Sequence, residues 1–400
     1  GGQTIFGGVV GAVPFTSITT DLDGAGGEAT QINGGSVTTI EDQFYGDPVT
    51  LGADATITGN DITFNSTLDD GAGGPFSLDV NTMDTGMPGI TLFNGAIGSN
   101  DPLRALTTNA DGETHYNGLT ADFAGSTVTH HDAVILLNSL TITEAGTGDV
   151  TFNSTVHSFA TEFNSLTVNT TGEGATIFNA AVGAGANQEL GALTTDATGA
   201  DGTTQINGAT VETTGIQTYN DPVTIGVGTS ADATLTGATV IFNNTLDAAT
   251  AAMEGVTIIG DAVFGDGGDD WVGNTASLDF LSVSLTTTFN SNSDASAAPG
   301  RRASVLTENN QTYNGNVTLG NHTILSSDAS GTITFAGTIN GDGVEAWDLF
   351  VNTAGLTQFA GGMVGDMNIL RNLVTDDLVA PAQRRGGTTE LSGVFNTTIN

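Results

Sequence analysis

The stretch Tyr219-Asn220-Asp221-Pro222-Val223-Thr224-Ile225 has three related copies elsewhere in this chain, at residues 45–51, 130–136 and 313–319. Each copy joins a short turn-like tetrad to a run built on valine and a second apolar residue. The valines that begin these runs are 134 − 49 = 85, 223 − 134 = 89 and 317 − 223 = 94 residues apart. The chain is therefore predicted to be built from a repeat of about 88 residues.

Two further blocks recur in the same order. One places a phenylalanine third in a four-residue block, at residues 62–65, 150–153, 240–243 and 333–336. The other occupies residues 18–21, 106–109, 193–196 and 306–309, and its last spacing, 306 − 193 = 113, is too long. We assign the excess to an Asp/Gly-rich insertion at residues 254–277. Residues 1–400 are then expected to form one continuous domain of about four and a half repeats.

Within each block, apolar residues alternate with polar ones and a glycine, asparagine or aspartate follows. This period of two predicts short β-strands with Val49 and Leu51 inward and Thr50 outward. Four phenylalanines are candidates for the core, and three asparagines for polar corners where the chain turns: Phe64, Phe152, Phe242 and Phe335, and Asn65, Asn153 and Asn243. No apolar stripe has the helical period over three turns, so little or no helix is expected.

Short strands with frequent corners are typical of a sandwich, a barrel or a solenoid, and the long repeat favours the solenoid. One coil cannot bury its inner face alone, whereas stacked coils share one core. With about 22 residues per coil, a repeat would make four coils and the chain roughly 18. The predicted fold is an all-β, single elongated parallel β-helix.

Composition limits the partners. The chain has 44 acidic and 6 basic residues, for a formal net charge of −38. Such a surface repels nucleic acid and anionic lipid, because both are bound through lysine and arginine. No apolar run reaches 18 residues, so no membrane insertion is expected. The absence of cysteine excludes thiol chemistry.

Residues 166–170, 203–208 and 217–224 resemble the repeats of filamentous haemagglutinins and related β-helical bacterial surface adhesins. The resemblance covers nearly the whole chain, although those proteins are commonly far longer. It implies a right-handed parallel β-helix, secretion, and an adhesive or surface-layer role at the cell surface or outside the cell. It carries no functional residue over, because such repeats are scaffold.

The chain opens and closes in mid-repeat, and neither end shows a polar cap. Two explanations fit: an excised segment, or subunits that stack end to end into a filament with copies of the chain as partners. Two arginine pairs, Arg301-Arg302 and Arg384-Arg385, are the only cationic clusters. They could neutralise charge locally or contact the acidic surface of a neighbouring subunit.

Residues 265–272 come close to a calcium-binding nonapeptide repeat, which makes Asp266, Asp269 and Asp270 candidate Ca²⁺ ligands. The alternative is a solvated Gly/Asp loop, because such sites form between tandem copies and one copy is present. Acid pairs such as Asp69-Asp70 could serve glycoside cleavage, but adjacent residues on a strand point to opposite faces. We expect a structural protein and no enzyme. The alternative is a β-helix that binds or cleaves carbohydrate, with surface glycans as ligands.

Overall fold

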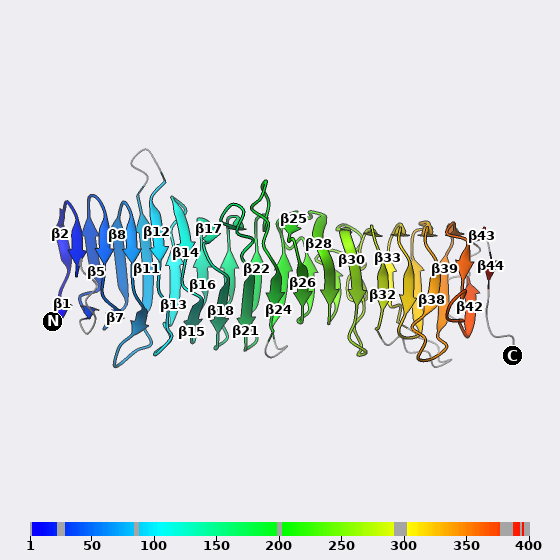
Figure 1. Cartoon of the computed structure of the whole chain (residues 1–400), viewed down its shortest axis with the longest axis horizontal. Helices are drawn as coiled ribbons and strands as arrows, with labels where there is room; N and C mark the ends of the chain where they lie inside the picture. The colour runs from blue at the N-terminus through cyan, green and yellow to red at the C-terminus, as the bar shows by residue number, and fades with distance from the viewer. Residues whose placement is uncertain are drawn as a thin grey trace. The chain divides into compact units, whose positions relative to one another are not determined.

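The computed structural model describes residues 2–21, 29–83, 88–197, 202–291, 302–376, 387–392 and 394–395. These residues form short strands that pair in parallel, and they contain no α-helix. The chain divides into two compact units, Gly1–Thr203 and Thr204–Asn400. Each unit is a stack of coils in which strands from successive coils lie side by side (Figure 1). The predicted all-β parallel β-solenoid is confirmed.

Each coil of the first unit has three sides, and each side continues through the stack as a parallel sheet. Face 1 comprises β1 (Thr4–Phe6), β4 (Thr30–Ile32), β7 (Val49–Leu51), β10 (Leu68–Asp70), β15 (Thr120–Phe123), β18 (Leu140–Glu144), β21 (Leu166–Thr170) and β23 (Leu193–Thr195). Face 2 comprises β2 (Val10–Phe15), β5 (Ser36–Thr39), β8 (Ala55–Gly59), β11 (Ser77–Thr82), β13 (Ala105–Thr108), β16 (Val128–His130), β19 (Val150–Phe152) and β22 (Ala175–Phe178). Face 3 comprises β3 (Ile18–Thr20), β6 (Gln43–Tyr45), β9 (Ile62–Phe64), β12 (Ile90–Phe93), β14 (Glu113–Tyr116), β17 (Ala133–Leu136) and β20 (Val156–Ser158).

The second unit has the same three-sided coil, and two of its long strands span two sides each. Face 4 comprises β24 (Thr203–Ile206), β27 (Val223–Ile225), β29 (Leu246–Ala248), β33 (Val305–Thr307), β36 (Thr323–Ser327), β39 (Asp348–Thr353) and β42 (Asn372–Thr375). Face 5 comprises β25 (Thr210–Glu212), the first halves of β28 (Ala233–Phe242) and β30 (Val256–Phe264), β31 (Leu281–Val283), β34 (Gln311–Tyr313), β37 (Ile333–Phe335), β40 (Leu356–Phe359) and β43 (Thr388–Leu391). Face 6 comprises β26 (Ile216–Tyr219), the second halves of β28 and β30, β32 (Thr287–Phe289), β35 (Val317–Leu319), β38 (Ile339–Gly341), β41 (Met363–Val364) and β44 (Val394–Phe395).

The coils are fewer and longer than the sequence suggested. The described residues form about 14 turns where roughly 18 were expected. Paired residues in successive coils are separated by 49 − 30 = 19 residues at the Thr30–Val49 pair and by 311 − 281 = 30 at the Leu281–Gln311 pair. Loops at the corners lengthen many coils beyond 22 residues without disturbing the stack.

The sequence repeat is not a whole number of coils. Strands β4 and β14 hold equivalent positions in successive repeats. Between them the chain passes eleven times from one side of the coil to the next, and the single bridge residue Ile97 counts as one side. We call each such passage a step. At three steps per coil this is three and two thirds coils, so β4 lies on face 1 and β14 on face 3. Eleven steps also separate β27 from β35 in the second unit. The expected four coils per repeat is wrong, and each repeat begins one face away from the preceding one.

The stretch at residues 254–277 contains a regular strand. β30 is nine residues long and pairs with β28 on one side and with β31 and β32 on the other. The Asp/Gly-rich part is therefore confined to the segment after Phe264. In the wide spacing of the last repeat, 305 − 289 = 16 positions separate the end of β32 from the start of β33.

The expected alternation of inward and outward side chains is confirmed. In β7, Val49 and Leu51 are 1% and 0% exposed, whereas Thr50 between them is half-buried. Phe64, Phe152, Phe242 and Phe335 are each 1% exposed. A three-residue strand buries two side chains and exposes one, which is why such short runs suffice for each side of a coil.

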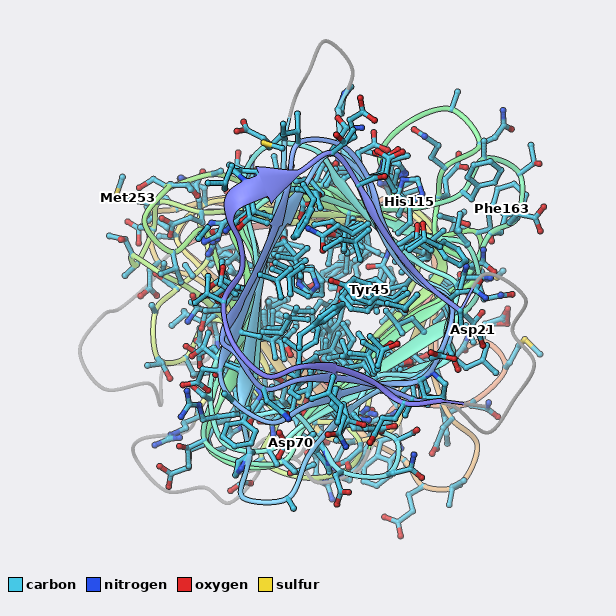
Figure 2. The ribbon with its side chains drawn as sticks, turned by 90° about the vertical axis from the view of Figure 1, so that its left-hand side faces the viewer. Asp21, Tyr45, Asp70, His115, Phe163 and Met253 are labelled. Carbon is cyan, nitrogen blue, oxygen red and sulfur yellow. The ribbon has the colours of Figure 1, made fainter. Side chains whose placement is uncertain are left out.

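The inward aromatic rings stack along each unit. In the first unit the stack lies on face 3 and then on face 2, with ring centroids 5.2 to 5.7 Å apart, through Tyr45, Phe64, Phe93, Tyr116, His130, Phe152 and Phe178. Neighbouring rings on one face are near parallel, within 24°. Figure 2 shows Tyr45 inside the ribbon. The rings fill one part of the coil interior, and buried valine, leucine and isoleucine side chains fill the rest.

The stack changes face where one repeat passes to the next. Tyr116 on face 3 meets His130 on face 2 at 66°, edge to face. In the second unit Phe289 on face 6 meets Tyr313 on face 5 at 82°. These crossings follow from the eleven-step repeat. Four full coils would take twelve steps and return to the same face, so after eleven steps the next run of aromatic residues begins on the neighbouring face. Edge-to-face contact is a favourable geometry for aromatic rings, so the stack continues across the change.

A substitution within the stack should destabilise the fold strongly. Phe64→Ala removes a ring that is stacked on both sides, by Tyr45 and Phe93. We expect a loss of about 3–5 kcal/mol in the free energy of unfolding, measured by guanidinium chloride denaturation. The control is Phe159→Ala, because Phe159 is 51% exposed. A shift for Phe64→Ala no larger than for the control would contradict the role of the stack.

Candidate functional site: a double loop in every repeat

The regular coil is interrupted at one equivalent place in each repeat. An inward valine or isoleucine is followed by a glycine with positive φ, then by a loop that ends at a fully buried leucine. The glycines are Gly98 (φ 65°), Gly183 (70°), Gly273 (73°) and Gly365 (68°). The leucines are Leu103, Leu190, Leu278 and Leu370, each 0% exposed. At Gly98 a Cβ would lie 2.2 Å from the Asp122 carbonyl oxygen, so the close approach of the next coil requires glycine.

A second loop protrudes beside it from the preceding coil. Backbone hydrogen bonds join the two segments in each repeat, at or just before the first loop. They include Asp70 N to Asp101 O (2.9 Å), Thr161 N to Asn187 O (2.8 Å), Ala252 N to Ser277 O (2.8 Å) and Gly341 N to Asn368 O (3.2 Å). We call each such pair of loops a double loop. The four double loops comprise residues 71–76 with 98–103, 159–165 with 183–190, 249–255 with 273–278, and 342–347 with 365–370.

Polar side chains at the base hold three of the double loops. The Oδ1 atom of Asp69 accepts a hydrogen bond from the Asn100 N–H at 2.9 Å. Asp247 accepts from the N–H groups of Thr275 (2.9 Å) and Ala276 (3.2 Å) in the equivalent place. Asn340 accepts from Met367 (3.0 Å) and Asn368 (3.4 Å). In the second repeat His157 occupies this position, and its Nδ1 lies 3.2 Å from the Ser158 carbonyl oxygen.

The double loops lie at different corners of the coil. In the first unit, the first follows β10, between faces 1 and 2, and the second follows β20, between faces 3 and 1. Figure 2 shows Asp70 and Phe163 at separate corners. In the second unit, the third follows β29 and the fourth follows β38, again at different corners. The eleven-step repeat therefore moves the protrusion around the coil.

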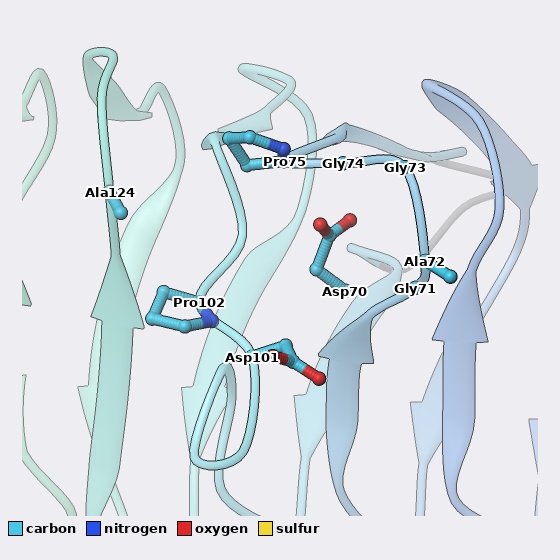
Figure 3. A pocket seen from close by; sticks show the side chains of 9 residues that line it. All are labelled: Asp70, Gly71, Ala72, Gly73, Gly74, Pro75, Asp101, Pro102 and Ala124. Carbon is cyan, nitrogen blue, oxygen red and sulfur yellow. The ribbon is translucent and has the colours of Figure 1, made fainter.

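The tips differ in chemistry. The first borders an open pocket of about 470 Å³ lined by residues 70–75, Asp101, Pro102 and Ala124 (Figure 3). Burial raises the pKa of Asp70, whose carboxylate accepts the Phe76 N–H at 2.9 Å. The second exposes Phe159 and Phe163, the third Met253, and the fourth Val344, Met367 and Ile369. Similar stems thus carry different tips.

An ionic cluster lies at the base of the fourth double loop. Arg371 pairs with Asp348 through Nε at 2.9 Å and through a second nitrogen, and Asn372 donates to the same carboxylate at 2.8 Å. Burial alone would raise the pKa of Asp348, but these hydrogen bonds outweigh it and lower the pKa. Burial lowers the pKa of His322, which accepts the Asp348 N–H at 3.0 Å. This cluster connects three successive coils and was not predicted from the sequence.

The three candidate calcium ligands lie in one loop after β30. The Oδ2 atom of Asp270 accepts the N–H groups of Asp266 (3.0 Å) and Gly268 (3.1 Å), so Asp270 closes the loop on itself. Burial raises the pKa of Asp270. Asp266 and Asp269 are exposed. Over the described ranges, no three His, Asp or Glu side chains gather as a metal-binding group. Calcium binding stays a prediction.

Of the four arginines predicted to contact a neighbouring subunit, one lies within the described residues. Arg302 lies with its guanidinium carbon 4.2 Å from the centroid of the Trp271 ring, in a cation–π contact within the second unit. Arg301, Arg384 and Arg385 lie outside the described residues. Their predicted contact with a neighbouring subunit stays a prediction.

The expected polar corners are confirmed as asparagine ladders. Asn94 donates to Asn65 at 3.1 Å, Asn179 to Asn153 at 2.8 Å, and Asn243 to Asn220 at 2.8 Å. These asparagines directly follow an inward aromatic residue in most coils. The amide ladder at the corner therefore runs beside the ring stack inside.

Buried polar groups accompany the stack. Gln43, Gln217 and Gln311 point inward, and each accepts the hydroxyl of the tyrosine two residues later, at 2.6, 3.1 and 3.0 Å. These glutamines were not predicted from the sequence, although the spacing Gln-x-Tyr places them on the inward face. In the second repeat His130 replaces the tyrosine, and its Nε2 lies 2.8 Å from the Tyr116 hydroxyl.

Together these features define a parallel β-solenoid repeat protein whose loops protrude from its corners. No family model, curated protein or solved structure matches the chain. No helix in the described ranges is long and apolar enough to cross a membrane.

His130 should make the fold sensitive to acid. Complete burial lowers its pKa from 6.5 to about 3. Between these values the unfolded chain binds a proton that the folded chain does not, so stability falls as the pH falls. Relative to His130→Phe, the wild type should lose up to about 1.4 kcal/mol per pH unit in this window, measured by denaturation at several pH values. A pH-independent difference between the two proteins would contradict the prediction.

The base of a double loop should contribute measurably to stability. Asp69→Ala leaves the Asn100 N–H and side-chain amide without the carboxylate that accepts them at 2.9 and 3.0 Å. We expect a loss of about 1–3 kcal/mol in the free energy of unfolding. Asp79→Ala is the control, because Asp79 is exposed on β11 and carries the same charge. Equal effects of the two substitutions would count against the role of Asp69.

Proposed function

We propose that the chain is a structural scaffold, a β-solenoid segment of an extracellular surface filament or adhesin stalk. The observation that carries this proposal is the ring stack, which occupies the inward positions of successive coils within each unit. A coil interior filled in this way supports rigidity. Recurrence of the double loop in every repeat also favours a scaffold over a protein built around one reaction centre.

The surface supports a role in a salty, exposed setting. A formal net charge of −38 keeps the chain soluble, and salt screens its self-repulsion. The six basic residues are all arginine, so trypsin-like proteases find few sites. The resemblance of the sequence to filamentous haemagglutinin repeats agrees with this role. It supports the solenoid fold and does not point to a particular receptor.

Electron microscopy of the purified chain tests the scaffold role. We expect elongated particles: long uniform fibres for a filament subunit, or single rods for a stalk segment. Images taken with and without a few millimolar Ca²⁺ show whether assembly depends on calcium. If it does so through the Asp266–Asp270 loop, the effect of calcium should be lost in Asp269→Asn. Compact round particles would contradict the scaffold proposal.

The arginine pairs can be tested in the same assay if fibres form. Replacing Arg301, Arg302, Arg384 and Arg385 by alanine should shorten the fibres, because the acidic surface of the next subunit loses its cationic partner. The matched control is Arg104→Ala, because Arg104 already pairs with Asp54 of its own unit at 3.0 Å. Fibres of unchanged length in the fourfold variant would exclude the pairs from assembly.

A carbohydrate-binding role is the second candidate, favoured by a shallow polar groove on face 2. Asp54, Ser77, Arg104 and outward threonines of β8, β13 and β16 line this groove of about 410 Å³. Hydroxyl, carboxylate and guanidinium groups are suited to sugar hydroxyls. Binding to a glycan array that is lost in Arg104→Ala would support it.

A further inference from the structure

The fourth double loop carries an exposed apolar tip. Val344 is 81% exposed, Met367 82% and Ile369 49%. The two loops that bear them are joined by the Gly341 N–H to Asn368 carbonyl bond at 3.2 Å and by the Asn368 Nδ2 to Gly341 carbonyl bond at 3.0 Å. Large apolar side chains gathered on a protrusion mark an interaction site more often than isolated ones do.

The base of this tip is held by a buried leucine and by several hydrogen bonds. Leu370 is fully buried, and Asn340 accepts the N–H groups of Met367 and Asn368. The Trp347 indole donates to Asp342 at 3.0 Å, and the Arg371 N–H donates to the Trp347 carbonyl at 2.8 Å. Because these contacts already hold the loops in place, less conformational entropy is lost when a partner binds.

The rim of the tip is acidic. Asp342, Glu345 and Asp366 are exposed beside Val344 and Met367. Several backbone N–H groups and the Trp347 indole bond to Asp342, and although burial opposes them its pKa is lowered, so it carries its charge at neutral pH. The neighbouring cation, Arg371, is paired with Asp348. An apolar centre with an acidic rim is complementary to a partner with apolar side chains flanked by lysine or arginine.

We propose that this tip is a docking site for a cationic amphipathic segment of another protein. A second copy of the chain is a poor partner, because it has 6 basic residues against 44 acidic ones. Nucleic acid and anionic lipid carry the same sign of charge as the rim. This inference goes beyond the scaffold role, since it concerns one loop pair and holds whether or not the chain forms filaments.

Fluorescence anisotropy with a labelled peptide of alternating leucine and lysine tests the proposal. The variant Val344→Ser/Met367→Ser/Ile369→Ser should bind this peptide at least about tenfold more weakly than the wild type. The matched control, Ile40→Ser/Leu119→Ser/Leu285→Ser, removes three apolar residues that are 57%, 64% and 53% exposed elsewhere and should bind as the wild type does. Circular dichroism should show all these proteins folded.

Charge is tested separately. Asp342→Asn/Glu345→Gln/Asp366→Asn should weaken binding of the leucine–lysine peptide and reduce its salt dependence. A lysine–serine peptide should bind the wild type and the apolar-tip variant equally, because it reports the general negative charge alone.

Three results would overturn the proposal. Equal affinity of the leucine–lysine peptide for the wild type and the apolar-tip variant would show that the tip does not dock it. Equally tight binding of a neutral leucine–serine peptide would remove the need for cations. Self-association by sedimentation that is lost in the apolar-tip variant would identify a second copy as the partner. None of these results bears on the particle shape that tests the scaffold role.

Discussion

A parallel coil can bury its inner face only against the coils before and after it, and the rest of this structure depends on that constraint. Neighbouring strands lie about 4.8 Å apart, so an inward side chain must fit its counterparts at that spacing. Flat aromatic rings meet this requirement, with centroid separations of 5.2 to 5.3 Å between Tyr45, Phe64 and Phe93. The asparagine ladders at the corners satisfy polar groups at the same spacing.

The second organising feature is the mismatch between an eleven-step repeat and a three-sided coil. If the repeat were twelve steps long, every double loop would lie at the same corner of its unit. One step fewer moves each repeat by one side, which turns the ring stack at Tyr116–His130 and at Phe289–Tyr313. Within each unit the two double loops consequently face different directions.

The double loop separates stability from surface chemistry. Its stem is determined by a glycine with positive φ, a buried leucine and, in three repeats, a side-chain oxygen that accepts backbone N–H groups. The residues at the tip are not needed for packing of the stem, so they differ between repeats. The first tip forms a glycine-rich pocket beside Asp70, and the fourth exposes the apolar residues Val344 and Met367. This arrangement allows the exposed tips to differ without disturbing the stack.

From the amino-acid sequence one could predict the strands, the inward phenylalanines, the asparagine corners and the stacked-coil fold, because alternation and recurrence are local properties that burial in a stack preserves. Even the Gln-x-Tyr and Gly-to-Leu spacings are visible in the sequence once their meaning is known. The number of sides per coil is visible only in the folded chain. It shows that a repeat of about 88 residues makes three and two thirds coils. Corner loops vary in length at little energetic cost, so residue counts do not reveal where a coil closes. Which segments become neighbours in successive coils likewise decides that the loops bearing Val344 and Met367 are joined, and that Asp348 pairs with Arg371.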